Sequence, residues 1–292
     1  MSAAVLETLS VGEALRRGAA RLRAAGVEAP SRDARLLLAE ATGRDSSRLV
    51  AFPERTLGAG ELAAYEAFLT RRARREPVSR ILGRREFWSL DFAVTADTLD
   101  PRPETETLVE AVLARLPDPK AALRILDLGC GSGCILLALL AELRRARGLG
   151  VDCSAAAVEV AGRNAEALGL EDRAAFQVGD WARGLAGGWQ AIVSNPPYIV
   201  ETDIEDLAPE VKVYDPGTAL SGGADGLDAY RVLLPQAARL LAPDGLLAVE
   251  FGAGQAEAVG RLAEAAGLRV ADVVRDLAGH NRCLIATPFS RG

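Results

Sequence analysis

The chain has 292 residues, of which 49% are hydrophobic and 25% are charged, a composition typical of globular proteins that bury a full core. Its formal net charge of −6 excludes a general phosphate-binding surface, although a local basic patch stays possible. The N-terminus lacks the apolar core of a signal peptide, and no stretch approaches the roughly 18 apolar residues that a membrane span needs. We therefore expect a cytoplasmic protein of about two domains.

Three segments in the first part of the chain have apolar residues at helical spacing: 10–26, 31–43 and 60–76. Ser31 is the expected N-cap of the second helix, Gly43 is its expected end, and Pro77 is expected to stop the third helix. These segments predict a small helical domain over residues 1–76.

An arginine-rich run begins in the last part of the third predicted helix and continues beyond it. Residues 71–85 contain seven arginines and one glutamate. Such a run is typical either of a solvated helix end and linker, or of a patch that binds an acidic partner or RNA. The sequence leaves both interpretations open.

The next segment joins the two predicted domains. Residues 86–99 alternate and are rich in aromatic and β-branched side chains, which predicts a β-hairpin within a linker over residues 77–100. The prolines and acids that follow, from Asp100 onward, are typical of the start of a helix.

Short apolar strands alternate with helical patterns from residue 122 to the end. This alternation predicts an α/β domain over residues 101–292 with a largely parallel, doubly wound sheet. The segments 269–277 and 281–289 are expected to form a final pair of strands.

A glycine-rich turn, Leu126 to Gly133, lies between the first strand of this domain and its helix. Glycine permits a positive φ and a close approach of backbone to a ligand. The helix is expected to begin at about Ser132, so that its free N–H groups face the turn. The spacing Gly129-x-Gly131-x-Gly133 differs only loosely from the dinucleotide-binding fingerprint, and taken alone it is weak evidence.

Polar and aromatic residues follow the next two strands. Asp152 is placed to accept hydrogen bonds from ribose hydroxyls. Its alternative role is that of a helix N-cap, which Ser154 can fill instead. Asp180 and Trp181 follow the third strand, where a carboxylate can accept from an adenine amino group and an indole can cover the ring. A tryptophan in the core is the alternative for Trp181.

The fourth strand ends in Asn195-Pro196-Pro197-Tyr198. Pro196 keeps Asn195 out of helical conformation, and both prolines fix φ and lack N–H donors. The result is a stiff loop that presents carbonyl groups. Because ligands of open α/β sheets bind at the carboxyl ends of the strands, we expect all these features to meet at one edge of the sheet.

Few side chains are available for other chemistry. The four cysteines, Cys130, Cys134, Cys153 and Cys283, form no C-x-x-C pair, and we interpret Cys130 and Cys134, which have helical spacing, as small buried residues and not as a metal site. His280 is the only histidine and is expected in a surface loop. One histidine leaves little room for a Ser-His-Asp or Cys-His hydrolase or for a histidine-based metal site.

The order of D-x-G-x-G-x-G, a strand-end acid, D-W and N-P-P-Y resembles class I S-adenosylmethionine-dependent methyltransferases. The N-P-P-Y subset acts on adenine N6, guanine N2 or glutamine N5. Further stretches resemble the HemK/PrmC family, whose members methylate the glutamine of the Gly-Gly-Gln motif in peptide chain release factors: "ILGRREFWSLDFAV", "PRPETETLVE", "VSNPPYI", "ADGLDAYRVL" and "DLAGHNR". The match spans nearly the whole chain.

The resemblance implies a Rossmann-like methyltransferase sheet with an antiparallel last strand, preceded by a helical substrate-recognition domain and a hairpin linker. It implies that S-adenosylmethionine is bound by Gly129, Cys130, Gly131, Ser132, Gly133, Asp152, Trp181 and Asn195. It implies that the substrate glutamine is held by Asn195, Pro196, Pro197 and Tyr198. Asn195, Pro196 and Tyr198 are the expected catalytic residues. The expected partner is a release factor, bound by a monomer that contacts neither membrane nor nucleic acid.

Four residues depart from the family pattern without touching the core chemistry. Arg80 stands for a usual tyrosine, Asp100 for an aliphatic residue, Cys130 for a threonine and Asp215 for a glutamate.

Other functions stay open on the motifs alone. A nucleic-acid adenine or guanine methyltransferase would use the same N-P-P-Y loop, and a ribosomal-protein glutamine methyltransferase would share the core. A cofactor-binding module without catalysis is disfavoured by the intact N-P-P-Y. A dehydrogenase is weaker still, because nothing after the glycine turn indicates nicotinamide chemistry.

Overall fold

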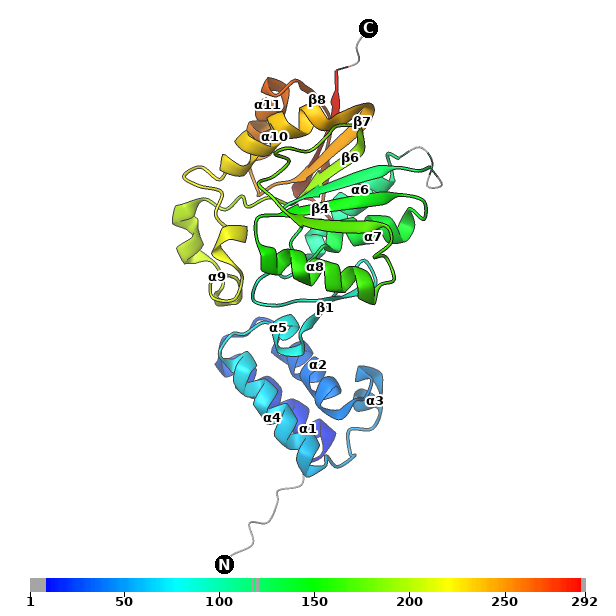
Figure 1. The fold of residues 1–292 in the computed structure, drawn as a ribbon. Coiled ribbons are helices and arrows are strands. Elements are labelled where there is room, and N and C mark those ends of the chain that lie inside the picture. The colour runs from blue at the N-terminus through cyan, green and yellow to red at the C-terminus, as the bar shows by residue number, and fades with distance from the viewer. Residues whose placement is uncertain (1–8, 117, 119–120, 290–292) are drawn as a thin grey trace, which may run out of the picture. The chain divides into compact units, whose positions relative to one another are not determined.

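The structure is a computed structural model that describes residues 9–116, 118 and 121–289 (Figure 1). The chain divides into two compact units. The first contains Met1–Gly83 and Ala208–Tyr214, and the second contains Arg84–Leu207 and Asp215–Gly292. The chain therefore leaves the second unit once, contributes a short segment to the first, and returns. None of the helices in the described ranges is long and apolar enough to cross a membrane.

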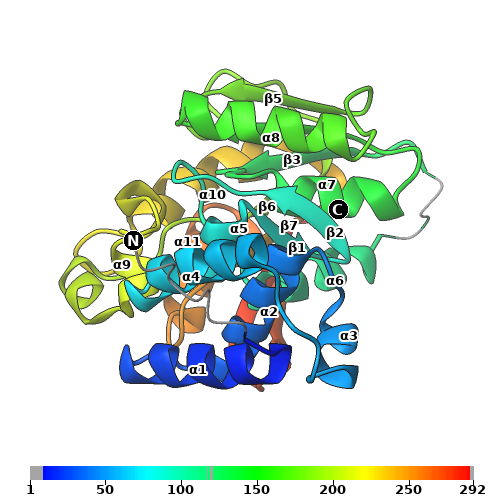
Figure 2. The ribbon, with the colours of Figure 1, turned by 90° about the horizontal axis from the view of Figure 1, so that it is seen from below.

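The first unit is helical, and Figure 2 shows its helices from below. Its elements are α1 (Val11–Ala24), α2 (Pro30–Thr42), α3 (Ser46–Ala51), α4 (Ala59–Ala73), α5 (Val78–Leu82) and, from the returning segment, α9 (Pro209–Lys212). Apolar side chains at helical spacing close its core, among them the fully buried Leu22, Leu37 and Leu69. The three long helices confirm the helices predicted from periodicity, but the predicted end of the third is wrong, because α4 ends at Ala73 and Pro77 is the N-cap of α5. The short α3 and α5 were not predicted, since one turn or so is too short to show a period.

The predicted cap of the second helix is wrong. Pro30 is the first residue of α2 and Ala29 is its N-cap, so Ser31 already lies inside the helix. Proline suits the first helical position because its missing N–H would have no partner there. At the other end, Gly43 adopts the left-handed conformation with a φ of 61°, as expected for a glycine that ends a helix.

The arginine run is partly buried and paired within the first unit. Glu210, in the returning segment, accepts from Nε and Nη2 of Arg75, each at 2.6 Å, and from Nη2 of Arg72 at 2.9 Å. Arg72 is only 5% exposed and also donates to Asp33 at 2.8 Å. A bidentate arginine–carboxylate pair with a second, buried arginine is among the stronger ion pairs in proteins. The run is thus in part an internal clamp on residues 208–214, which neither interpretation of the sequence foresaw.

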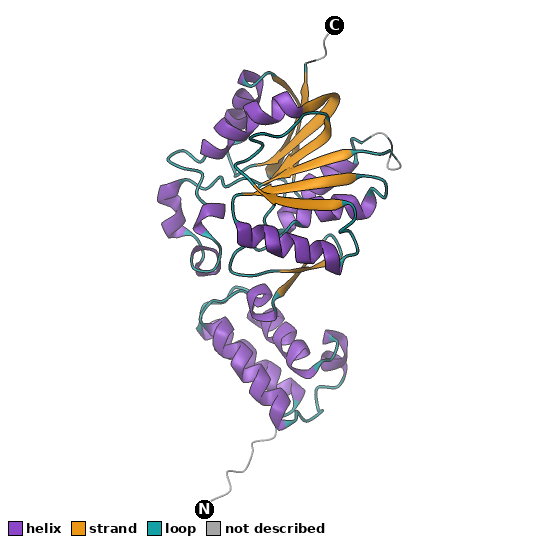
Figure 3. Cartoon of the chain, viewed as in Figure 1, coloured by secondary structure: helices purple, strands orange, loops and turns teal. Residues whose placement is uncertain are grey.

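The second unit is built on a seven-stranded sheet in the order β5-β4-β3-β6-β7-β9-β8. Figure 3 draws strands in orange and the helices around them in purple. The strands of this sheet are β3 (Arg124–Leu128), β4 (Arg147–Asp152), β5 (Ala174–Val178), β6 (Trp189–Ser194), β7 (Leu241–Glu250), β8 (Leu268–Arg275) and β9 (Asn281–Pro288). The first five are mutually parallel, and β9 runs antiparallel to both of its neighbours. The predicted fold class, with its antiparallel last strand, is confirmed.

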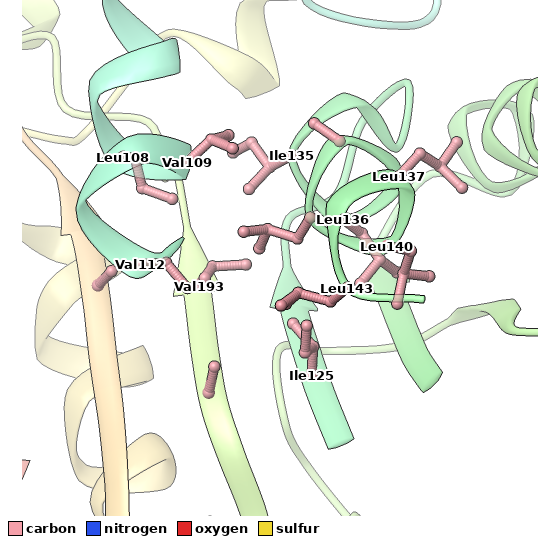
Figure 4. Close-up of a cluster of buried hydrophobic side chains, with 14 of the residues drawn as sticks. Leu108, Val109, Val112, Ile125, Ile135, Leu136, Leu137, Leu140, Leu143 and Val193 are labelled. Atoms are coloured by element: carbon pink, nitrogen blue, oxygen red, sulfur yellow. The ribbon is translucent and has the colours of Figure 1, made fainter. Parts of the chain in front are cut away.

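Helices cover both faces of this sheet. They are α6 (Glu106–Leu113), α7 (Cys134–Glu142), α8 (Ala155–Ala167), α10 (Asp228–Leu240) and α11 (Ala256–Ala265), with the 3-10 turns η1 (Pro103–Thr105), η2 (Glu201–Asp206) and η3 (Gly217–Ala219). Alternate strand residues face opposite layers. Ile125 lies beneath the side chains of α7 in Figure 4 and shares one apolar cluster with α6 and α7, whereas its neighbour Leu126 belongs to the cluster that contains α10 and α11. This sandwich holds the strand ends rigidly in place.

A hairpin of β1 (Arg84–Phe87) and β2 (Leu90–Ala93) precedes the sheet, which confirms the predicted hairpin. Trp88 and Ser89 form its two-residue turn with φ values of 53° and 56°, the signs that a type I′ turn requires. Such values are unusual for residues other than glycine. Trp88 is held there by hydrogen bonds from its backbone N–H to Glu106 and from its indole N–H to Glu142.

Candidate active site

A pocket of the second unit lies where β3, β4, β5 and β6 end. Its lining includes these residues singled out from the sequence: Gly129, Cys130, Gly131, Ser132, Asp152, Asp180, Trp181, Asn195 and Pro197. Three further predicted site residues, Gly133, Pro196 and Tyr198, do not line it. The structure therefore brings together residues that are up to 68 positions apart, from Gly129 to Pro197.

The glycine loop takes a path that side chains would disfavour. Gly129, Gly131 and Gly133 have φ values of 72°, 53° and 79°, in the region that favours glycine. Gly133 is the N-cap of α7, so the helix begins at Cys134 and not at about Ser132 as predicted. A Cβ atom on Gly133 would lie 3.1 Å from the Phe176 ring. Gly133 thus serves close packing behind the loop, while Gly129 and Gly131 form the wall of the pocket.

Asp152 is fixed at the pocket by backbone donors. Its Oδ2 accepts from the N–H of Gly131 and its Oδ1 accepts from the N–H of Ser154, both at 2.9 Å. The hydroxyl of Ser154 accepts from the N–H of Ala157 and caps α8. Ser154 therefore takes the capping role, and the carboxylate of Asp152 keeps further lone pairs for a ligand.

Trp181 lies at the adjacent strand end in an uncommon backbone conformation. Its φ is 51°, which costs a residue other than glycine on the order of 1 kcal/mol. Its ring is half-buried and faces Gly129, where an added Cβ would stand 3.6 Å from the indole. Asp180 beside it is exposed. The strained turn places the indole in the lining of the pocket.

Asn195 is oriented by a residue far away in the sequence. Its Nδ2 donates to Oγ1 of Thr105 at 3.2 Å. Because the amide nitrogen is engaged there, the amide oxygen stays available as an acceptor. The preceding Ser194 anchors the strand end by donating to the carbonyl oxygen of Leu128 at 2.6 Å.

Tyr198 is held outside the lining of the pocket. Its hydroxyl donates to Oε1 of Glu250 at 3.3 Å, and its carbonyl oxygen accepts from Nε2 of Gln255 at 2.9 Å. Burial raises the pKa of the Tyr198 phenol well above its usual range, so the group stays protonated. Pro196 is buried as well. The loop from Asn195 to Tyr198 is therefore held in place both by side-chain hydrogen bonds and by a hydrogen bond to its backbone.

Two buried carboxyl groups lie behind the site. Burial is the main cause that raises the pKa of Asp127 to about 7, and the charge of Asp152 contributes to this rise. Burial also raises the pKa of Glu250 to about 7, against the lowering effects of Thr105 and Arg282. Within the described chain, neither Asp127 oxygen has a hydrogen-bond partner. Both groups therefore ionise at a higher pH than a carboxyl group in water does.

Thr105 and Arg102 are pocket residues that sequence reasoning missed. Arg102 donates to Oδ2 of Asp215 at 2.5 Å, and the N–H of Asp100 donates to Oδ1 of the same carboxylate at 3.3 Å. Arg102 and Thr105 both lie in the "PRPETE" stretch. The signal available in the sequence was the polar side chain of Arg102 between two prolines. Only the fold shows that this stretch meets the loop at Asn195.

The cysteines and the histidine that the structure describes form neither a disulfide nor a metal site. All four cysteines are free thiols, and Cys130, Cys134 and Cys283 are buried. Burial raises the pKa of Cys134 to about 12. His280 is exposed in its loop, with 68% of its side chain accessible. Among the residues that the structure describes, no group of three or more His, Cys, Asp or Glu side chains stands close enough to hold a metal ion.

Comparison with known families and proteins gives concordant results. The family model described as "PrmC N-terminal domain" matches residues 13–83, and that described as "Methyltransferase small domain" matches residues 95–213. A protein of Rhodospirillum rubrum named release factor glutamine methyltransferase is 57% identical over 284 residues, covering 97% of this chain and 87% of its own. One of the same name from Caulobacter vibrioides is 47% identical over 279 residues, covering 95% and 96%.

Solved structures support the fold alone. A methyltransferase from Pyrococcus furiosus superposes with a TM-score of 0.50 at 17% identity, over 68% of this chain and 88% of the other. Fold does not determine the reaction. The chemistry must therefore be argued from the pocket and from the curated relatives.

Proposed function

The chain belongs to the release factor glutamine methyltransferase family, and from this we propose that it methylates the side-chain amide nitrogen of the glutamine in the Gly-Gly-Gln motif of release factors, with S-adenosylmethionine as the donor. One observation supports this most directly. A single pocket joins the glycine loop and Asp152 to Asn195 and Pro197, so the methyl donor and the amide acceptor can be held side by side.

The residues at the carboxyl ends of β3, β4 and β5 fit the donor. Gly131 leaves open space at the wall, since nothing lies within 4 Å of the place where its Cβ would be. The fixed carboxylate of Asp152 suits the two hydroxyls of a ribose, and the face of Trp181 suits an adenine ring. When bound, S-adenosylmethionine supplies a methyl group already activated on a positively charged sulfur.

The loop after β6 fits a planar amide. A carboxamide nitrogen is a poor nucleophile because its lone pair is delocalised into the carbonyl, so positioning and local polarity matter more than a strong base. In this proposal the Oδ1 of Asn195 would accept one N–H of the glutamine, and the carbonyl oxygen of Pro196, a residue behind the pocket lining, would accept the other. S-adenosylmethionine would supply the methyl group to the nitrogen held in this way and leave as S-adenosylhomocysteine, while the nitrogen would lose one proton to water.

The helical unit gives the protein substrate a second contact. We assign to it the grip on the release factor at a distance from the glutamine loop, because the family model of the N-terminal domain matches it over residues 13–83. Binding energy from remote parts of a substrate can be used to position the reacting group. If the helical unit grips the release factor, deletion of residues 1–76 should raise KM for the release factor, and an unchanged KM would contradict this assignment.

Labelled S-adenosylmethionine incubated with the protein and purified release factors tests the reaction. We expect label on the release factor, and we expect none when the glutamine of its Gly-Gly-Gln motif is replaced by alanine. Ribosomal proteins, DNA and RNA serve as parallel substrates. Label on a ribosomal protein alone, or on nucleic acid alone, would assign the chain to one of the alternative methyltransferases and refute the proposal.

A further inference from the structure

The second unit contains a buried carboxyl group to which the proposed chemistry gives no role. Glu250 is the last residue of β7 and is only 1% exposed. In the parallel pairing of β6 with β7, Val249 lies opposite Ser194. Glu250 therefore stands next to the point where the Asn195 loop leaves the sheet. A glutamate is almost never fully buried unless it has a specific partner.

The contacts of Glu250 lead to two residues of that loop. Its Oε1 accepts from the hydroxyl of Tyr198 at 3.3 Å. The hydroxyl of Thr105 lies close enough to lower its pKa, and Thr105 is itself only 2% exposed. The Oγ1 of Thr105 accepts in turn from Nδ2 of Asn195 at 3.2 Å. One carboxyl group thus stands behind both ends of the Asn195–Tyr198 loop.

The groups around this carboxyl come from several elements. Arg282 on β9 favours its ionised form and Glu104 in η1 disfavours it. Tyr230 on α10 donates its hydroxyl to the backbone carbonyl oxygen of Glu250 at 2.8 Å, and Cys283 lies opposite it on β9. The main chain of Glu250 is therefore held by α10 on one side and by β9 on the other, so the position from which its side chain extends is fixed.

We infer that Glu250 is a positioning residue for methyl transfer, which holds Tyr198 directly and, through Thr105, the amide of Asn195. The inference rests on the proposed function, because Glu250 maintains the positions of the oxygen atoms that are proposed to accept hydrogen bonds from the substrate amide. Glu250 does not line the pocket and so acts through other residues. Its removal lets the loop relax while the binding surface for the donor, at β3 and β4, stays in place.

Kinetics of Glu250→Ala and Glu250→Gln test this role. A misplacement on the order of 1 Å costs about 100-fold in rate, so we expect kcat of the alanine variant to fall about 10- to 100-fold. We expect affinity for S-adenosylhomocysteine, measured by calorimetry, to change by less than about twofold. Glutamine keeps an acceptor oxygen and the volume, and it is expected to retain most of the activity.

Coupling between residues separates positioning from general destabilisation. If Glu250 acts through Tyr198, the loss caused by Tyr198→Phe should be smaller in the Glu250→Ala background than in the wild type. Additive effects would contradict the inference. So would a wild-type kcat in Glu250→Ala, or a loss of donor affinity as large as the loss of kcat. Glu257→Gln is the matched control, because the side chain of Glu257 is 87% exposed.

Hydrogen exchange supplies a readout that does not depend on the substrate. The N–H of Ile199 donates to the carbonyl oxygen of Leu220 at 3.0 Å, and we expect it to exchange at least about tenfold faster in Glu250→Ala but not in Glu257→Gln. If the wild type leaves release factors unmethylated, the proposed function fails, and the exchange result still decides whether Glu250 holds the loop. Unchanged exchange would refute the inference even in an active enzyme.

Discussion

The orientation of one side-chain amide decides what the pocket can recognise. Asn195 could present either its oxygen or its nitrogen to a ligand. The hydrogen bond from Nδ2 to Thr105 leaves the oxygen to the pocket, and the prolines that follow add no N–H donor of their own. Acceptor oxygens at this loop suit a ligand that carries an NH2 group, and this polarity supports the proposed methyl transfer to nitrogen.

Asn195→Ala should reduce methyl transfer by at least about 100-fold, since it removes one of the two acceptors that aim the nitrogen. The pocket wall at Asp152 is untouched, so affinity for S-adenosylhomocysteine should stay close to that of the wild type. Turnover with labelled donor and calorimetry measure the two quantities. Wild-type turnover in this variant would exclude the role given to Asn195.

Asp152→Asn should mainly weaken donor binding. The substitution removes the charge of the acceptor and turns one of its two oxygens into an NH2 group, which cannot accept from a backbone N–H. Hydrogen bonds to a charged acceptor contribute about 1.5–3 kcal/mol, so we expect Kd for S-adenosylhomocysteine to rise about tenfold or more. Calorimetry tests this, and an unchanged Kd would show that the carboxylate does not bind the donor.

The buried Asp127 predicts a pH-dependent stability. Its pKa in the folded state is raised to about 7 from 3.8, so the neutral form is favoured by folding. The stability that it contributes is fully present below the unfolded pKa and is lost as the pH rises through about 7, with a slope of at most about 1.4 kcal/mol per pH unit. Asp127→Asn cannot ionise. Its Tm relative to the wild type should therefore rise between pH 5 and pH 8, whereas a constant difference would show that Asp127 does not titrate in this range.

At the scale of elements, the strands determine the positions of the pocket residues, and the loops that follow the strands contain these residues. The ends of β3, β4, β5 and β6 set the spacing between the glycine loop, Asp152, Trp181 and Asn195. The loop after β6 continues through η2 into residues 208–214, which pack with the helical unit, and then returns to η3. The connection from residue 195 to residue 218 thus lines the pocket at Asn195 and again at Thr218. Between these two points, its residue Glu210 binds Arg72 and Arg75.

Glu210→Gln should loosen this connection without unfolding either unit. Hydrogen bonds from Arg75 and Arg72 lower the pKa of Glu210 despite its burial, which shows that the ionised carboxylate is the form they stabilise. Removing the charge should speed hydrogen exchange at the N–H groups of Val211 and Lys212, which donate to the carbonyl oxygen of Ala208. Glu201→Gln, an exposed site in η2, is the control. Equal exchange in both variants would mean that the arginines do not hold the segment.

For the whole molecule, the two units have separate cores. The apolar cluster of the helical unit shares no residue with the two clusters on the faces of the sheet. The pocket lies entirely within the second unit. A ligand of the pocket is therefore expected to stabilise one unit selectively, by the free energy of its binding.

Differential scanning calorimetry of the full chain should show two transitions, because each unit buries its own core. S-adenosylhomocysteine at about 100 times its Kd adds about 2.7 kcal/mol to the unit that binds it, and it should raise the Tm of only one transition. A single transition that moves as a whole would show that residues 208–214 couple the units into one cooperative structure.

Much of this protein could be predicted from the sequence because its signals are local. The alternation of strand and helix patterns predicted the fold class. Closely spaced glycines and the paired prolines predicted the two loops of the site, and the order of the motifs indicated the family. Each of these signals depends on a few neighbouring residues. The cap of α2 and the start of α7 were mispredicted by one to two residues, since several neighbours can fill such positions.

Only the tertiary structure decided which distant residues meet. Thr105 orients Asn195 across 90 positions, Tyr198 reaches Glu250 across 52, and Glu210 joins Arg75 across 135. No periodicity encodes such pairs, because each depends on the packing of whole elements against one another. The sequence by itself determined where the chemistry lies along the chain, and the fold decided how its atoms are aimed.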